Sequence, residues 1–466
     1  MSRKPIHRKL SWFLDGSRLL ALGACLLAGS QLFSQVPDTP PAPASHNPEA
    51  AVPQTSATGP IAFRQAVELA LEHSGIMGIA TVNQWRSMKA YQEVKNHYLP
   101  QLTIGSGLGY SYGFPLTLEG SAPSVVNFTS SQAIFSLSLR QFLKAAKIEW
   151  KAQSFDVQDK RNAVILDTSL TYEQLNSIAS KIAALKKAQA AAEKAQFITE
   201  QRLKEGVDSQ LDLTRSQLVG ARIRLRIAEA ETQQDVLREH LSKLVGMPAG
   251  ELVIDGGSIP QPPLILQDED YSARAAENSP VVRLQEQKAL AADFRAKGEH
   301  KATLPTADLA SQYAYLAKFN NYDLYYQRYT ANNLSAGLNL RFPFLDFVQK
   351  ARAQQADAEA IVAHKQADLT RNQVAEDTLK LQRSIRQLEA ARDVAKLDWQ
   401  VSQGEAEAVS AKLQTGGANS RDQQNAELTT EDKYAAYLDS EFELRRTQLQ
   451  LLRITGELEN WAIPTP

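Results

Sequence analysis

Apolar side chains recur in alternating steps of three and four along two long segments that contain no proline. These segments lie between Pro123 and Pro248 and between Pro343 and Pro464. The first stripe is formed by Leu175, Ile178, Ile182, Leu185 and Ala192, with Gln189 interrupting it. The second stripe is formed by Val374, Thr378, Leu381, Ile385, Leu388, Ala395 and Trp399, with Arg392 interrupting it. A stripe with this spacing stays on one helix face and packs against a partner helix, so both segments are expected to form coiled-coil helices. Leu211, Leu218 and Leu225 are expected to continue the first stripe.

A glycine interrupts each segment, and an aspartate follows it six positions later. The two pairs are Gly206 with Asp212 and Gly416 with Asp422. Glycine readily takes the positive φ that ends a helix, so each break is predicted to be a turn between two helices. The helix expected over residues 142–205 would be roughly 95 Å long at 1.5 Å per residue. Helices of this length must lie against one another.

Polar residues after each break can cap the helix that returns. Asp208 is the expected cap in the first break, and Asn419 or Ser420 in the second, because their side-chain oxygens accept hydrogen bonds from free backbone N–H groups. Arg215 and Arg421 can form ion pairs at these turns, although solvated surface charges are the simpler interpretation.

Four shorter segments alternate apolar with small or polar residues. They cover residues 102–112, 133–139, 309–316 and 334–340. Alternation with aromatic residues near the segment ends is typical of outer-membrane barrel strands. An ordinary soluble sheet is the alternative. Four strands cannot close a membrane barrel, since the smallest have about eight, so several copies would have to share one barrel with cyclic symmetry.

The chain is an internal duplication. Residues 72–76 (EHSGI) align with 277–281 (ENSPV), and the same offset aligns Leu99-Pro100 with Leu304-Pro305. Each copy is expected to hold a helix (61–96 and 271–300), a strand pair and two long helices. The copies span residues 61–250 and 271–461, joined by a linker over 251–270 and followed by a tail over 462–466.

The N-terminal segment has the features of an export signal. Basic residues precede an apolar stretch over residues 19–28, and Ala28-Gly29-Ser30 fits a signal peptidase site, so residues 1–30 are interpreted as a signal peptide. A short membrane anchor is the alternative, but the apolar stretch is well below the roughly 20 residues needed to span. Leu22-Gly23-Ala24-Cys25 also resembles a lipobox, in which Cys25 would be lipidated. Residues 31–60 are rich in proline and alanine and are expected to form a tether.

Composition argues against several function classes. The formal net charge of −1 gives no basic face for nucleic acid. One cysteine allows neither an intramolecular disulfide nor a cysteine zinc site. The histidines show no metal-ligand spacing, and no phosphate loop or nucleophile motif is found. We therefore expect no enzyme activity, no catalytic residue, no metal and no cofactor.

The order of these features resembles the TolC-type outer-membrane efflux protein family. The resemblance covers residues 61–461 and rests on the duplicated Glu-x-Ser-(Gly/Pro) motif, the entry Arg341-Phe342-Pro343-Phe344, the stretch over 244–248 (LVGMP) and the paired glycine breaks. The chain departs from the family in having Leu345-Asp346-Phe347 where many members have two glycines, and Gly75 where proline is usual.

The resemblance implies an α+β membrane protein. Four strands from each of three protomers would form one 12-stranded barrel, and the long helices would form a periplasmic α-helical tunnel. The homotrimer would be the passive exit duct of a tripartite efflux or type I secretion system, in contact with outer-membrane lipid, a periplasmic adaptor and an inner-membrane transporter. The alternative function is a periplasmic coiled-coil adaptor or structural scaffold, which would not explain four amphipathic strands.

The resemblance also implies roles for residues at the turns. Asp422 matches the position of an aspartate ring at the narrow end of the tunnel, where three carboxylates would favour cations. A second acidic ring is common three residues later, where this chain has Asn425, so a weaker gate is expected. Asp212 matches the corresponding first-copy position. Adaptor docking is expected at the turns, formed by Gly206, Val207, Asp208, Gly416, Gly417 and Ala418.

Overall fold

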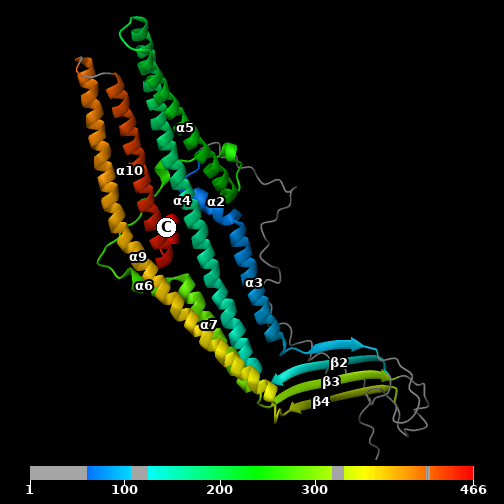
Figure 1. Ribbon diagram of the computed structural model, residues 1–466. Helices are drawn as coiled ribbons and strands as arrows, with labels where there is room; N and C mark the ends of the chain where they lie inside the picture. Colours follow the sequence, from blue (N-terminus) through cyan, green and yellow to red (C-terminus); the bar gives the residue numbers. More distant parts are fainter. Residues whose placement is uncertain (1–59, 107–123, 317–329, 416, 418–419, 465–466) are drawn as a thin grey trace, which may run out of the picture. The chain divides into compact units, whose positions relative to one another are not determined.

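The computed structural model describes residues 60–106, 124–316, 330–415, 417 and 420–464 (Figure 1). The first copy contains helices α2 (Phe63–His73), α3 (Gly75–Asn96), α4 (Leu137–Lys204) and α5 (Gln210–Val245) and strands β1 (Gln101–Gly105) and β2 (Ser124–Phe135). The second contains helices α6 (Tyr271–Asn278), α7 (Pro280–Lys301), α9 (Phe347–Gln414) and α10 (Ser420–Thr455) and strands β3 (Thr306–Leu316) and β4 (Asn332–Arg341). Two short 3₁₀ helices, η2 (Ala249–Glu251) and η3 (Gly256–Ser258), lie between the copies. Helix α11 (Leu458–Ala462) follows α10. The predicted order of elements is thus present in both copies.

Several predicted boundaries differ from the structure; β2, for example, begins at Ser124 and not at residue 133. The strand predicted over residues 133–139 is wrong beyond Phe135, because Ser136 caps α4 by accepting a hydrogen bond from the backbone N–H of Leu139 at 3.1 Å. The helices predicted over 61–96 and 271–300 are each two helices. Ser74 and Ser279 take extended backbone angles and separate α2 from α3 and α6 from α7.

The helices pack as a layer of four columns. α4 forms the second column and contacts α3 and α5 on one side and α7 and α10 on the other. α9 packs against α7 and α10. The first column therefore consists of α3 and α5, the third of α7 and α10, and the fourth of α9. The first and fourth columns form the two flanks of the layer.

The predicted stripes on the two long helices are mostly buried. Leu175, Ile178 and Ile182 are buried in α4, and Thr378 and Ile385 are buried in α9. The prediction for α5 is wrong within one chain, because Leu211, Leu218 and Leu225 are exposed. α5 packs instead through Ser216, Gly220, Ile223 and Ile227, which have the same three-and-four spacing on another face.

The main core lies where α2, α4, α5 and the segment after α5 meet, and Tyr172 is at its centre. Its side chain is fully buried and contacts the Phe63 ring edge-on, with 5.5 Å between ring centroids. The hydroxyl donates to the carbonyl of Ile61 at 2.7 Å and accepts from the N–H of Asp255 at 2.9 Å. Burial raises the pKa of this phenol.

Tyr172→Phe is expected to lower the free energy of unfolding by about 0.5–1.5 kcal/mol, because it removes the hydrogen bonds to the Ile61 carbonyl and the Asp255 N–H, which keep a 3.2 Å hydrogen bond to each other. Chemical denaturation followed by circular dichroism measures the change. Tyr313→Phe is the matched control, since the Tyr313 hydroxyl bonds only at the exposed surface to Asn332. Equal effects of the two substitutions would contradict the assignment.

The four strands form one antiparallel sheet in the order β1-β2-β3-β4. The pairing of β2 with β3 joins the two copies, with Ser130 opposite Ser311. β1 and β4 are the edge strands of the sheet. None of the helices within the described residues is long and apolar enough to span a bilayer.

Candidate functional site

The sheet has one apolar and one polar face. Directly paired residues share a face and alternate residues face opposite ways, so the register defines both sets. The apolar face carries Leu102, Ile104, Phe128, Leu309, Tyr313, Tyr315, Leu334, Leu338 and Leu340. The polar face carries Gln101, Thr103, Thr129, Ser131, Ala310, Gln312, Ser335, Gly337 and Asn339. This division is the pattern of a strand set with hydrocarbon on one side and water on the other.

Neither face is covered by other parts of the chain that the structure describes. Leu102, Leu334 and Leu338 on the apolar face are 64–68% exposed. The polar side chains line a hollow of about 630 Å³ that spans all four strands. The hollow is therefore lined mainly by uncharged polar and small side chains together with Leu338, and the same face carries Asp308 opposite Asn339.

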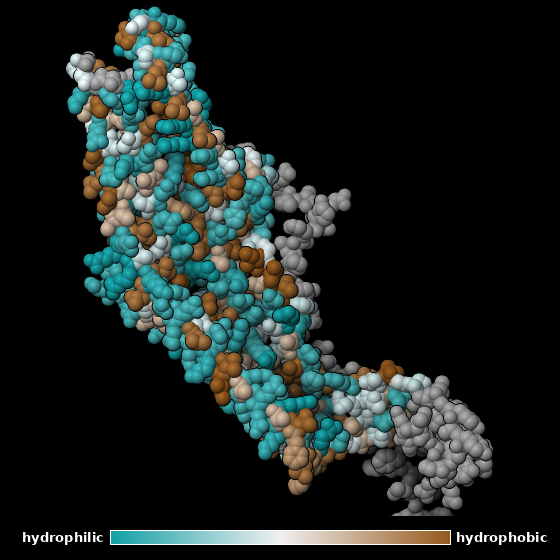
Figure 2. Space-filling view, in the orientation of Figure 1, coloured by the Kyte–Doolittle hydropathy of each residue, from teal (hydrophilic) through white to brown (hydrophobic). Residues whose placement is uncertain are grey.

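Both flanks of the helix layer carry exposed apolar stripes. On α9, the stripe of Ala390, Val394, Leu397, Val401, Gly404 and Ala408 follows steps of four and three. Val394, Leu397 and Val401 are each 60% exposed, and nothing lies within 4 Å of a Cβ placed on Gly404. On α5, Leu211, Leu218 and Leu225 form a stripe of seven-residue spacing. We call these the α9 edge stripe and the α5 edge stripe; Figure 2 shows apolar side chains at the helix surface among hydrophilic ones.

The first turn is closed by backbone and side-chain hydrogen bonds. Gly206 has φ 76°, and the N–H of Val207 donates to the carbonyl of Arg202 at 2.8 Å. The predicted capping role of Asp208 is wrong, because its carboxylate instead accepts from Arg202 Nε at 3.1 Å. Ser209 caps α5 by accepting from the Asp212 N–H at 3.2 Å.

Asp212 completes this cap. Its carboxylate accepts hydrogen bonds from the Ser209 hydroxyl and from the Ser209 backbone N–H, the latter at 3.2 Å, and Arg215 lies 3.5 Å away. These bonds to the Ser209 hydroxyl and N–H lower the pKa of Asp212. Arg215, for which a solvated surface charge was the simpler interpretation, forms an exposed ion pair with Asp212. Asp212 is held as a capping carboxylate.

The second turn is described in part. Thr415 ends α9, and the Gly417 N–H donates to the carbonyl of Lys412 at 2.8 Å. Asp422 lies in the first turn of α10, and Asn425 follows three residues later in the same helix. Gly416, Ala418 and the proposed cap Asn419 lie outside the described residues, as do Cys25, the signal peptide and residues 31–59 of the tether.

One buried hydrogen bond links the two turns, and sequence reasoning missed it. Gln424 Nε2 donates to Ser216 Oγ at 3.1 Å, and both residues are buried. Leu428 packs with Ile223 and Ile227 just above it. Ser216 could have been found from its three-and-four spacing with Gly220 and Ile223.

The histidines take part in contacts between helices. His240 lies 3.2 Å from Asp167, and the Nε2 atoms of His300 and His364 lie 2.8 and 3.1 Å from Asp357 and Asp293. The described residues contain no group of three or more histidine, cysteine or acidic side chains that could hold a metal ion.

Comparison with known proteins identifies the class. Residues 66–247 match the family model of the outer membrane efflux protein. No curated protein matches the chain by sequence. The fold is similar to the outer-membrane channel OprN (18% identity, TM-score 0.70, covering 85% of this chain and 90% of that one). It is also similar to VceC of Vibrio cholerae (16%, 0.68, 84% and 96%) and to MtrE of Neisseria gonorrhoeae in its open state (16%, 0.67, 85% and 89%).

The fold of the chain is therefore that of outer-membrane channels. Its first copy carries the outer membrane efflux protein domain, and both copies take the fold of these channels. The resemblance to the TolC-type family is confirmed, and the family is one of channels rather than enzymes.

Proposed function

We propose that three copies of this chain form one channel that is the passive exit duct of a tripartite efflux or type I secretion system. The observation that carries the proposal is that the sheet and the helix layer each have two unpartnered edges, and that the sheet has one apolar and one polar face. One chain ends at β1 with α3 and α5 on one side and at β4 with α9 on the other. Each edge needs a partner that the chain itself does not supply.

Closure of the sheet follows from its edges. Unpaired backbone groups at β1 and β4 are costly in hydrocarbon, so strands cross a bilayer only in a closed barrel. β4 of one copy would pair with β1 of the next, and three copies would form twelve strands. The apolar face would meet outer-membrane lipid and the hollow polar face would line a water-filled passage.

The helix layer would close in the same way. The α9 edge stripe of one copy would pack against the α5 edge stripe of the next. α9 runs toward the turns and α5 away from them, so the two helices would be antiparallel, and small side chains such as Gly404 would receive large ones such as Leu218. The result is a helical tunnel, which we place in the periplasm.

One face of the layer is hollow and would be the inner wall. A recess of about 450 Å³ is lined from all four columns, by Arg86, Ser87, Glu149, Ala152, Gln153, Lys288, Ala292, Arg295, Ala356, Glu359 and Ala363. Because α3, α4, α7 and α9 all contribute, the layer is concave on this face. Its charges have both signs, which suits a passage that accepts varied cargo.

The turns would form the far periplasmic end, where we place the gate and the adaptor contact. Three copies of Asp422 around the axis would favour cations, and Asn425 would leave a second ring uncharged. The docking surface would comprise the turn residues Gly206, Val207, Asp208, Gly416, Gly417 and Ala418, with Val207 62% exposed. An inner-membrane transporter would supply the energy. Export through an N-terminal signal peptide precedes assembly. Cleavage at residues 28–30 would remove Cys25, whereas lipidation would require cleavage directly before Cys25.

Asp422→Ala is expected to weaken block of the channel by divalent cations about tenfold or more, because it removes three carboxylates from one ring. Single-channel conductance measured against Mg²⁺ concentration tests this. Asp212→Ala separates the two acidic positions, since Asp212 completes the cap of α5 and its removal should destabilise the first turn without relieving block. Unchanged block in Asp422→Ala would remove Asp422 from the gate.

Reconstitution in planar bilayers tests the function as a whole. The expected result is stepwise conductance from a detergent-extracted trimer. A chain that stays soluble without detergent and gives no conductance would favour the alternative, a periplasmic adaptor or scaffold. The apolar face of the sheet argues against that alternative.

A further inference from the structure

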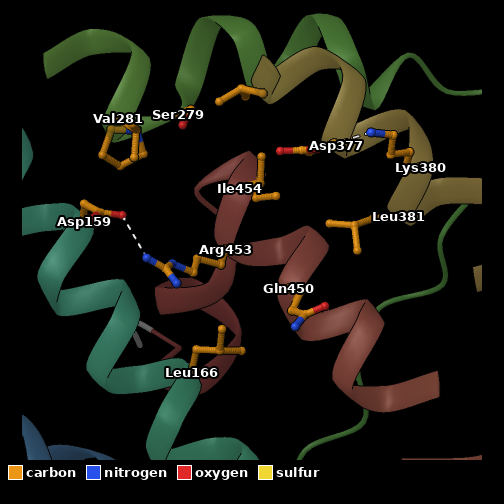
Figure 3. Close-up of a pocket in the computed structure, with 12 residues that line it drawn as sticks. Asp159, Leu166, Ser279, Val281, Asp377, Lys380, Leu381, Gln450, Arg453 and Ile454 are labelled. Atoms are coloured by element: carbon orange, nitrogen blue, oxygen red, sulfur yellow. Dashed lines mark hydrogen bonds and ion pairs between the residues drawn. The ribbon is translucent and has the colours of Figure 1, made fainter. Parts of the chain in front are cut away.

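A cavity of about 440 Å³ lies within the helix layer, where α10 ends and α7 begins (Figure 3). Its walls come from α4, α7, α9 and α10. The cavity exists because the third column consists of two helices that meet here. α10 ends at Thr455 and α7 begins at Pro280. α4 and α9 run past this junction without interruption and form the sides of the cavity.

The lining is apolar with internally paired charges. Leu166, Pro280, Val281, Val374, Leu381 and Ile454 provide the apolar walls. Arg453 Nη2 lies 3.2 Å from Asp159 Oδ1, and Lys380 Nζ lies 3.8 Å from Asp377 Oδ1 (Figure 3). The nearest partner of Lys380 is Glu376 Oε1, at 2.8 Å, which lies outside the lining. Charges that already have partners do not select an ionic ligand, so the cavity fits an apolar body of low net charge.

Helical spacing places the cavity on the same face as the recess assigned to the inner wall. Asp159 and Leu166 lie 7 and 14 residues after Ala152 on α4, and Val281 lies 7 residues before Lys288 on α7. Residues separated by whole heptads share one face of a coiled-coil helix. The cavity therefore opens toward the proposed passage, in contrast to the charged and alanine-lined recess beside it.

The first copy is packed differently at the equivalent junction. Its junction between α5 and α2 is filled by His73, whose ring would lie 2.7 Å from a Cβ placed on Gly246. The corresponding second-copy positions are Gly456 and Asn278, where a Cβ would meet only the Asn278 carbonyl oxygen, at 3.5 Å. The first-copy junction also lies in the flanking column and not between two helices.

We propose that this cavity binds small amphipathic molecules with an apolar, weakly charged body during their passage, at three sites per channel. The inference rests on the proposed function, because only a conduit brings cargo to this face. A volume of about 440 Å³ falls in the range of pockets that hold drug-sized ligands. The channel wall would therefore bind apolar cargo selectively at the position of this cavity along the passage.

Cysteine protection tests the proposal in the full chain, assembled in lipid nanodiscs. Cys25→Ser removes the single native cysteine, and Val374→Cys then places a thiol in the cavity. N-phenyl-1-naphthylamine is the probe and N-ethylmaleimide the labelling reagent. At a probe concentration about ten times its Kd, labelling of Val374→Cys should slow about tenfold. Ala363→Cys, on the same helix within the charged recess, is the matched control and should be unaffected.

A filling substitution provides the second arm. Ile454→Phe combined with Val374→Cys should abolish protection by the probe while the thiol stays reactive without it. An unreactive Val374→Cys thiol, no protection by the probe, or equal protection of Ala363→Cys would each overturn the proposal. Conductance of the same trimers, measured in planar bilayers, distinguishes the two inferences: conductance without protection removes the cavity site alone, and protection without conductance removes the channel function.

Discussion

Replacing Leu397 and Val401 together with glutamate is expected to convert the trimer to monomers. Both side chains are 60% exposed in the chain, in the middle of the α9 edge stripe. Burying each side chain in an interface contributes about 1.5–3 kcal/mol, and the gain occurs three times per assembly. An unpaired carboxylate buried in that interface would cost several kcal/mol more. This cost is similar to the loss of stability when one partner of a buried ion pair is removed. Native mass spectrometry of detergent-extracted protein measures the subunit number.

The control keeps the added charge and moves it off the stripe. Lys396 and Gln403 are exposed on the same helix outside the stripe, and their double replacement with glutamate should leave the trimer intact. Lysine at Leu218 on the α5 edge stripe should partly restore the trimer in the Leu397→Glu, Val401→Glu variant. A trimer that tolerates both glutamates would show that α9 faces solvent, and the proposed closure would be lost.

Arg445→Ala is expected to lower the free energy of unfolding by about 3–5 kcal/mol at neutral pH, because it leaves a buried carboxylate without its partner. The side chain of Glu173 is only 9% exposed, and Arg445 Nη1 donates to Glu173 Oε1 at 2.9 Å. Burial raises the pKa of Glu173 in spite of this cation. Thermal unfolding followed by far-ultraviolet circular dichroism measures the loss.

The pH dependence has a defined sign. The folded-state pKa of Glu173 is above its unfolded value, so the folded state gains relative stability as pH falls through that range and loses it as pH rises. Removing Arg445 strengthens this trend, so the deficit of Arg445→Ala should be largest near neutral pH and should shrink in acid. Adding Glu173→Gln should recover most of the stability. Lys433→Ala breaks an exposed ion pair with Asp398 and should cost less than about 1 kcal/mol; an equal cost for Arg445→Ala would contradict the burial argument.

The sequence predicted the plan of the molecule well because the plan is repeated and periodic. The duplication, the four strands and the two turns each depend on local chemistry that occurs twice. The sequence-based predictions were wrong where one residue pattern is compatible with two local structures. Ser136-Leu137-Ser138-Leu139 alternates like a strand, but the Ser136 hydroxyl starts a helix. Ser209, and not Asp208, caps α5 because only Ser209 stands three residues before Asp212.

The exposed edge stripes of the helix layer and the cavity could not be predicted from repetition and periodicity. Leu218 and Ile223 both follow helical spacing on α5, and only the packing of α4 shows that Ile223 is covered and Leu218 is not. The cavity depends on two helix ends, Thr455 and Pro280, that meet between two uninterrupted helices. Such features arise from contacts between distant segments, which a linear pattern does not contain.

The unpaired edges of the sheet also constrain the order of events during biogenesis. A single copy would expose unpaired backbone groups along one side of β1 and one side of β4. A lone four-stranded sheet with such edges is not stable in the hydrocarbon core of a membrane. Under the proposed function, protomers must therefore meet before or while their strands enter the membrane. Until then, the exposed Leu102, Leu334 and Leu338 make the free chain prone to aggregation. A periplasmic holding factor that shields this sheet would be needed at the stage when copies are still few.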